Sequence, residues 1–141
     1  MRQAFVIPGR LAGMNEINDS NRTNRYTGAK LKRSEQARVC AAIRQARLEP
    51  YSKPVSGAIL IVRNNRRSDR DNLEAGAKKV ILDALKETGI IKNDGWKLAL
   101  EFPAKCVYGT NERVVVMVTD EERTIEYIPY WTKLDSDEWD Y

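Results

Sequence analysis

Two aspartates separated by a single residue, Asp69 and Asp71, are the part of this sequence best suited to chemistry. They follow a β-branched run and open a stretch with helical periodicity. A third aspartate, Asp94, comes after that stretch, in a Lys-Asn-Asp-Gly-Trp turn. Carboxylate oxygens bind hard divalent ions such as Mg²⁺, which keeps several waters and needs only one or two carboxylates plus a substrate phosphate. The pattern therefore favours a metal site that acts on a phosphate.

Arginines precede the aspartate pair and interrupt it. Carboxylates beside arginines suit a small acidic ligand poorly, but they suit a metal-assisted cut in a phosphodiester backbone. Contacts from basic side chains to backbone phosphates position a nucleic acid and carry little sequence information. The expected phosphate contacts are Arg63, Arg66, Arg67 and Arg70, with Arg22, Arg25, Lys30, Lys32 and Arg33 upstream.

Each acid also has an ordinary structural interpretation. Asp71 could cap the following helix, with Asn72 as a rival for that role. No capping role is evident for Asp69. Asp94 falls in an Asn-Asp-Gly sequence that is common in turns. The acids indicate a site only as a set, if the helix returns Asp94 to the strand end that carries Asp69.

Composition predicts one soluble globular domain. The chain has 141 residues, 42% hydrophobic and 31% charged, with no apolar run near the ~18 residues of a membrane helix. The N-terminus lacks a secretory pattern, so we expect a cytoplasmic protein. Cys40 and Cys106 have no metal-site spacing and should be reduced thiols. Histidine is absent, which excludes histidine-based acid–base chemistry and makes a zinc site very improbable.

Charge is unevenly distributed along the chain. Residues 120–141 carry eight acidic and two basic side chains, whereas residues 1–119 carry 22 basic and 12 acidic ones. We therefore expect a basic domain over 1–119 and an acidic, aromatic tail over 120–141. A basic body attracts a polyanion at long range, although a solvated charged surface is the alternative interpretation. The tail could aid solubility or compete with nucleic acid for the basic face.

Hydrophobic periodicity predicts an α+β fold, a single domain with a small mixed or antiparallel sheet and two main helices. We expect a strand over 4–7 and a long functional loop over 9–30. A helix over 34–48, capped by Ser34, should follow. Next come a central strand over 55–62 and a helix from about 72 to 89. Residues 96–108 and 112–119 should form a hairpin.

Three segments carry a resemblance to a known family. The runs 67–73 (RSDRDNL), 78–85 (KKVILDAL) and 89–94 (GIIKND) resemble the RusA family of Holliday-junction resolvases. Weaker similarity extends over most of 1–119, including 7–10 and Asn15. The resemblance implies a RusA-like fold and a Mg²⁺-dependent endonuclease, with Mn²⁺ as a substitute. It also implies a homodimer that cuts four-way DNA junctions and is often encoded by a phage or prophage.

The resemblance assigns roles to individual residues. Asp69, Asp71 and Asp94 match the catalytic metal-binding acids, and alignment backward from Asp83 selects Lys79 as the essential lysine. Lys78 stays open, because four residues intervene relative to the usual spacing. Asn93 stands where the family usually has another acid. Asp83 would either support the lysine or form a surface ion pair with it.

The expected function is paired, symmetric nicking of branched DNA by metal-activated water, with no membrane and no small-molecule cofactor involved. Catalysis is expected from Asp69, Asp71, Asp94 and Lys79, with DNA contacts that include Lys78 and Asn15. Three alternatives remain at this stage. One is a branched-DNA-binding protein without activity, which Asn93 favours. A second is a metal nuclease that prefers flaps or forks. The third is an α+β interaction module whose acids are only caps and turns.

Overall fold

The computed structural model describes residues 1–23, 25–65, 69–92, 102–121 and 139–140, without the side chains of 19–26 and 139–140. The helices are α1 (Met14–Thr23), α2 (Arg25–Ala46) and α3 (Arg70–Glu87). The strands are β1 (Arg2–Pro8), β2 (Ser56–Arg63), β3 (Ala104–Gly109), β4 (Arg113–Thr119) and the two-residue β5 (Trp139–Asp140). Among the described residues, no helix is long and apolar enough to cross a membrane.

One mixed sheet organises the fold, which confirms the α+β prediction. The strand order is β1-β4-β2-β3-β5. β2 runs parallel to β3 and antiparallel to β4, and β1 is also antiparallel to β4. β5 extends the sheet beside β3, so residues 139–140 belong to the sheet. Every residue of β2 is buried, which confirms that this strand is central.

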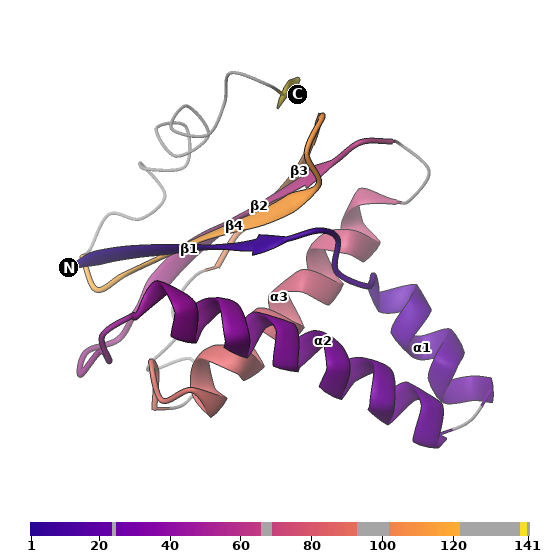
Figure 1. Cartoon of the computed structure of the whole chain (residues 1–141), viewed down its shortest axis with the longest axis horizontal. Helices are drawn as coiled ribbons and strands as arrows, with labels where there is room; N and C mark the ends of the chain where they lie inside the picture. The colour runs from indigo at the N-terminus through magenta and orange to yellow at the C-terminus, as the bar shows by residue number, and fades with distance from the viewer. Residues whose placement is uncertain (24, 66–68, 93–101, 122–138, 141) are drawn as a thin grey trace.

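The helices pack against one face of the sheet, as Figure 1 shows. The main core joins Ile59 and Ile61 of β2 to apolar residues of α2 and α3. Its helical part includes Val39, Ile43, Val80, Ile81, Ala84 and Leu85. Residues on the other face of β2 point away from the helices, because side chains alternate along a strand. Ala58, Leu60 and Val62 on that face form a separate buried cluster with Val107 of β3 and with Val115 and Met117 of β4.

Polar side chains of α2 hold the segment between β1 and α1. Glu35 is buried, and its Oε2 accepts a hydrogen bond of 2.9 Å from the backbone N–H of Ala12. Arg38 donates to the carbonyl oxygens of Pro8 and Arg10, at 2.8 Å each. Arg38 also pairs with Glu35 at 3.2 Å. This network fixes the direction in which the chain leaves the sheet toward α1.

The first turns of α1 and α3 meet at close range. The amide oxygen of Asn72, in α3, accepts a hydrogen bond from the backbone N–H of Asn15, in α1. A Cβ at Gly76 would lie 2.6 Å from the carbonyl oxygen of Ala12 and 2.9 Å from the nitrogen of Met14. Asn72 therefore accepts a hydrogen bond from a backbone N–H group at the N-terminus of α1, far away in sequence. Gly76 permits this close approach because it has no side chain.

The long loop expected over 9–30 is wrong, because α1 and the start of α2 occupy most of it. Ser34 consequently lies inside α2 and is not its N-cap, and the described residues form a third, shorter helix, α1, beside the two main helices. Residues 14–30 contain few apolar side chains, which made them read as a loop. Ile17 is buried, and contacts of α1 with Asn72 and Gly76 of α3 add packing that the apolar pattern of residues 14–30 does not indicate.

The expected hairpin is also wrong, because β3 and β4 do not pair with each other. β2 lies between them, parallel to β3 and antiparallel to β4. A strand that is apolar on both faces is best placed in the middle of a sheet, and the α3 crossover supplies the parallel neighbour. The predicted end of α3 is confirmed: Thr88 is the C-cap, and Gly89 adopts φ +78°.

Replacement of Gly76 by alanine tests the contact between α1 and α3. Alanine favours a helix over glycine by about 1 kcal/mol, but its Cβ would overlap backbone atoms of residues 12–14. We expect Gly76→Ala to lower the free energy of unfolding by about 1–3 kcal/mol in urea denaturation. Ala75→Gly, at the exposed neighbouring position, measures propensity alone. An increase in stability for Gly76→Ala would contradict the close approach.

Candidate metal and nucleic-acid site

The carboxyl ends of β1, β2 and β3 lie along one edge of the sheet, because β1 and β2 both oppose β4 and β3 parallels β2. Figure 1 shows α1 and α3 starting from this side. Crevices outside the carboxyl ends of strands are frequent ligand sites in open α/β sheets. Asp69 and Asp71 are both exposed at the start of α3. The aspartate pair therefore stands at this edge.

Asp69 is the N-cap of α3, which corrects the expectation that Asp71 or Asn72 has this role. Its φ and ψ are −67° and 130°, and its side chain accepts a 3.2 Å hydrogen bond from the backbone N–H of Asp71. Asp71 is instead in the first turn of the helix. A cap uses one carboxylate oxygen, so the second can serve as a metal ligand. The capping role therefore belongs to Asp69, the acid for which the sequence indicated no such role.

Glu74 is a third carboxylate at this edge, and sequence reasoning missed it. It lies one turn after Asp71, half-buried, and accepts a 3.2 Å hydrogen bond from the backbone N–H of Cys106 in β3. Burial raises the pKa of the Glu74 carboxyl, the bond from Cys106 opposes the shift, and the charge of Asp71 adds to it. The i,i+3 spacing from Asp71 was the available signal.

Arg63 does not have the exposed setting expected of a phosphate contact. It is 2% exposed, and its Nε lies 4.0 Å from Oε2 of Glu112. That nitrogen has no hydrogen-bond partner among the residues that the structure describes. Arg63 shares the helix-facing side of β2 with Ile59 and Ile61, because side chains alternate along a strand. It is therefore buried on that side of the sheet, not on the surface.

Arg70 remains exposed between the two aspartates. Its guanidinium carbon lies 5.4 Å from the centre of the Tyr108 ring, within the range of a cation–π contact. Tyr108 pairs in register with Arg63, so the contact ties the first turn of α3 to the end of β3. An arginine stacked on an aromatic ring still presents N–H donors to a phosphate. Asn15 is also exposed, at the start of α1.

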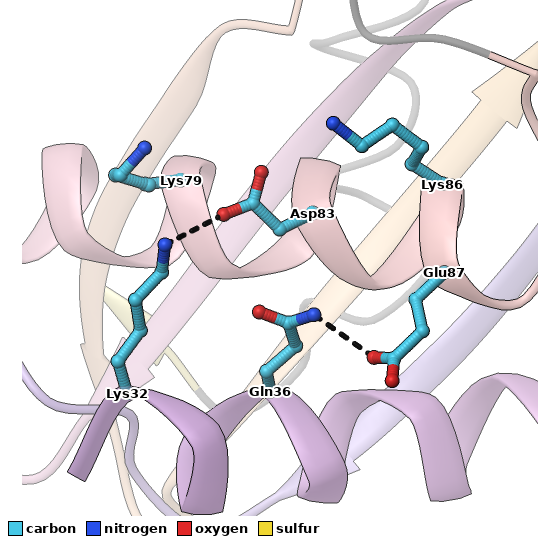
Figure 2. A pocket seen from close by; sticks show the side chains of 6 residues that line it. All are labelled: Lys32, Gln36, Lys79, Asp83, Lys86 and Glu87. Carbon is cyan, nitrogen blue, oxygen red and sulfur yellow. Dashed lines mark hydrogen bonds and ion pairs between the residues drawn. The ribbon is translucent and has the colours of Figure 1, made fainter. Parts of the chain in front are cut away.

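The two candidate lysines lie on different sides of α3. At about 100° per residue, Lys78 falls within about 20° of Asp71 around the helix axis, and Lys79 lies about 80° away. Lys79 lines a cleft between α2 and α3 together with Asp83, as Figure 2 shows. Asp83 pairs with Lys32 of α2 at 3.1 Å, so its ion-pair partner differs from the expected Lys79. The helix geometry favours Lys78 as the lysine on the aspartate side.

Several expected site residues lie outside what the structure describes. Asp94, Asn93, Arg66 and Arg67 fall in the undescribed ranges, and the side chains of Arg22 and Arg25 are likewise not described. Within the described residues, no group of three acids, cysteines or histidines is arranged to hold a metal. Asp69 and Asp71 nevertheless supply the hard oxygen donors that Mg²⁺ requires beside waters and a phosphate. The donor chemistry fits the expected ion.

Comparison with known proteins adds no further assignment. The sequence matches no protein-family model, and no curated protein is significantly similar to it.

Replacement of Glu74 by glutamine tests the crowding of acids at this edge. Because the pKa of Glu74 is raised in the folded protein, its ionised form disfavours folding. This penalty is absent well below pH 4.5, the ordinary pKa of the group, and it is complete above the raised pKa. We expect the stability of Glu74→Gln relative to the unchanged protein to rise between pH 4 and pH 7 in urea denaturation. Introducing Asp71→Asn into both proteins should shrink this rise. A difference in stability between the two proteins that does not change with pH would contradict the raised pKa of Glu74 and its acidic surroundings.

Proposed function

We propose that this chain is a Mg²⁺-dependent, structure-selective endodeoxyribonuclease that resolves four-way DNA junctions, a resolvase of the RusA type. The observation that carries the proposal is the placement of Asp69 and Asp71. Both carboxylates are exposed at the first turn of α3 with Arg70 between them, at the edge where three strands end. Metal ligands and a phosphate contact therefore share one short segment.

The chain's residues divide the chemical work as follows. Asp69 and Asp71 would hold the ion, and Asp94 completes the set by resemblance. When bound, Mg²⁺ supplies an acidified water and Lewis-acid stabilisation of the phosphate. Lys78, on the side of Asp71, would offset the charge that develops on the phosphate oxygens. Arg70 would orient the backbone, because its fork of N–H donors matches a phosphate.

Selectivity for structure rather than sequence follows from the kind of contacts available. Basic groups that meet phosphates hold DNA in register without reading bases. Resolution of a four-way junction needs two matched cuts, and a symmetric homodimer presents two identical sites. A dimer is thus part of the proposal.

A second candidate function is branched-DNA binding without cleavage. The capping role of Asp69 favours it, because that role alone accounts for a carboxylate at this position. A nuclease that prefers flaps or forks is a further variant of the main proposal. Cleavage assays on a panel of junctions, flaps, forks and linear duplex, in Mg²⁺ and in EDTA, separate the three. Binding without nicks in any metal would favour the second candidate.

Asp71→Asn tests the metal-ligand assignment. We expect cleavage of a four-way junction to fall at least about a hundredfold, because the metal contributes several kcal/mol of transition-state stabilisation. Junction binding, measured by gel shift, should stay intact or tighten, since a negative charge near phosphate is removed. Loss of binding together with cleavage would contradict the assignment.

Asp69 allows its two roles to be separated within the same experiment. Asparagine is as good an N-cap as aspartate, whereas alanine loses about 1 kcal/mol of stability. Asp69→Asn should therefore fold normally and fail to cleave, and Asp69→Ala should show both defects. Full cleavage by Asp69→Asn would leave capping as its only role.

The lysine assignment is testable by two neighbouring substitutions. Lys78→Ala should lower the cleavage rate at saturating junction, because Lys78 lies on the side of Asp71. Lys79→Ala should leave that rate nearly unchanged, because Lys79 belongs to the cleft between α2 and α3. Single-turnover kinetics with excess enzyme measure the rate apart from affinity. A larger rate defect for Lys79→Ala would reverse the assignment.

A further inference from the structure

The face of the sheet opposite the helices, called here the helix-free face, is apolar. It carries the separate buried cluster on β2, β3 and β4, whose members include Leu60, Val107 and Met117. All three helices pack on the other face, as Figure 1 shows, so the described elements give this cluster no second layer. A sheet face that meets only water normally carries polar side chains, whereas an apolar face is buried against another element. The buried cluster therefore needs a cover from outside the described elements.

The burial of neighbouring side chains shows where this cover ends. Val6, Val115 and Leu60 are register partners on the adjacent strands β1, β4 and β2. Partners directly opposite each other share one face of a sheet. Leu60 is 3% exposed and Val115 is 8% exposed, whereas Val6 is 51% exposed. The cover therefore lies over β2, β3 and β4 and stops before β1.

Both ends of the segment 122–138 are attached to this part of the sheet. β4, which precedes the segment, ends beside Ser56 at the start of β2. β5, which follows it, begins at Trp139, beside Gly109 at the end of β3. Because β3 is parallel to β2, these two points lie at opposite ends of the strands, about 25 Å apart at about 3.3 Å per residue. Residues 122–138 can span more than about 50 Å when extended, which suffices to cross the face.

The composition of this segment complements the helix-free face. Its large apolar and aromatic residues are Ile125, Tyr127, Ile128, Tyr130, Trp131 and Leu134. It also carries five acidic and two basic side chains. By the alternation along each strand, the charged residues that β1–β4 place on the helix-free face are all basic: Arg2, Lys105 and Arg113. Arg2 pairs at 3.5 Å with Glu121, the residue directly before the segment.

We propose that residues 122–138 dock on the helix-free face of the sheet in the same chain, and that β5 fastens the end of this segment beside β3. The segment then forms a third layer over the buried cluster. This role differs from the two that its charge suggested, an aid to solubility and a competitor of nucleic acid. The inference goes beyond the proposed function and does not depend on it. It also requires the proposed homodimer to use a surface other than this face.

Photo-cross-linking from Met117 tests the proposal in the full-length protein. Met117 belongs to the buried cluster and is 2% exposed. A diazirine analogue of methionine, incorporated during expression, reacts on illumination with whatever touches it. After digestion with trypsin, we expect a product that joins residue 117 to the peptide 124–133. Met14 of α1, on the other side of the sheet, is the internal control and should not join that peptide.

A mixture of isotopically heavy and light protein distinguishes the same chain from a second copy. We expect the product between residue 117 and the peptide 124–133 to be entirely heavy or entirely light. Products that join a heavy to a light chain would assign the cover to a second copy and overturn the proposal. Cross-links from residue 117 that reach only neighbouring strands would also overturn it. Neither result bears on DNA cleavage, so the proposed function would stand.

A variant without the apolar side chains of the segment gives a second measurement. Serine replaces the six residues Ile125, Tyr127, Ile128, Tyr130, Trp131 and Leu134. We expect this variant to lose the cross-link and to bind more of a dye that fluoresces on apolar surfaces. Val6→Ser, on the same face beyond the cover, is the matched control and should change neither readout. An undiminished cross-link or unchanged dye binding in the six-serine variant would contradict the docking.

Discussion

The burial of β2 is the constraint on which the rest of the structure depends. This strand is apolar on both faces, so it needs cover on both faces and a paired strand on each edge. β4 supplies an antiparallel neighbour and β3 a parallel one. A parallel neighbour requires a crossover, and α3 is that crossover. The first turn of α3 must therefore stand at the carboxyl end of β2, which is where Asp69 and Asp71 are displayed.

Polar contacts then fix the site within that frame. Glu35 and Arg38 hold the exit from β1, and Asn72 links the start of α3 to the start of α1. Glu74 ties the same turn of α3 to β3 through the backbone of Cys106. Each contact joins residues far apart in sequence, so the aspartates are supported from several elements at once. These contacts hold the backbone that carries Asp69 and Asp71, and a rigid backbone reduces the freedom that side chains on it would lose on binding a ligand.

Local signals were sufficient for some elements and insufficient for others. The sequence predicted β2, which is apolar on both faces, and the end of α3 at Gly89. Both signals, the apolar pattern of a strand and a glycine with positive φ after a helix, are properties of short segments. α1 was not readable, because its stability comes from Asn72 and Gly76. The prediction that β3 and β4 pair was wrong because two strands joined by a short turn usually form a hairpin. That β2 needs a neighbouring strand on each side depends on the whole sheet and cannot be inferred from a short segment. Glu74 was overlooked because its i,i+3 spacing from Asp71 is a weak signal, and its contact with β3 depends on the fold.

Capping and metal binding at Asp69 are compatible, and the geometry of a helix start explains why. The backbone N–H groups of the first turn stabilise a negative charge there, so an acidic residue is favourable at this position whether or not an ion is bound. A capping hydrogen bond also fixes the rotation of the carboxylate, and only one of its two oxygens is used. The same bond ties the Asp69 carboxylate to the backbone of Asp71, two residues later. A capping role alone would account for Asp69, but it is also compatible with a catalytic acid, because a cap can orient the carboxylate.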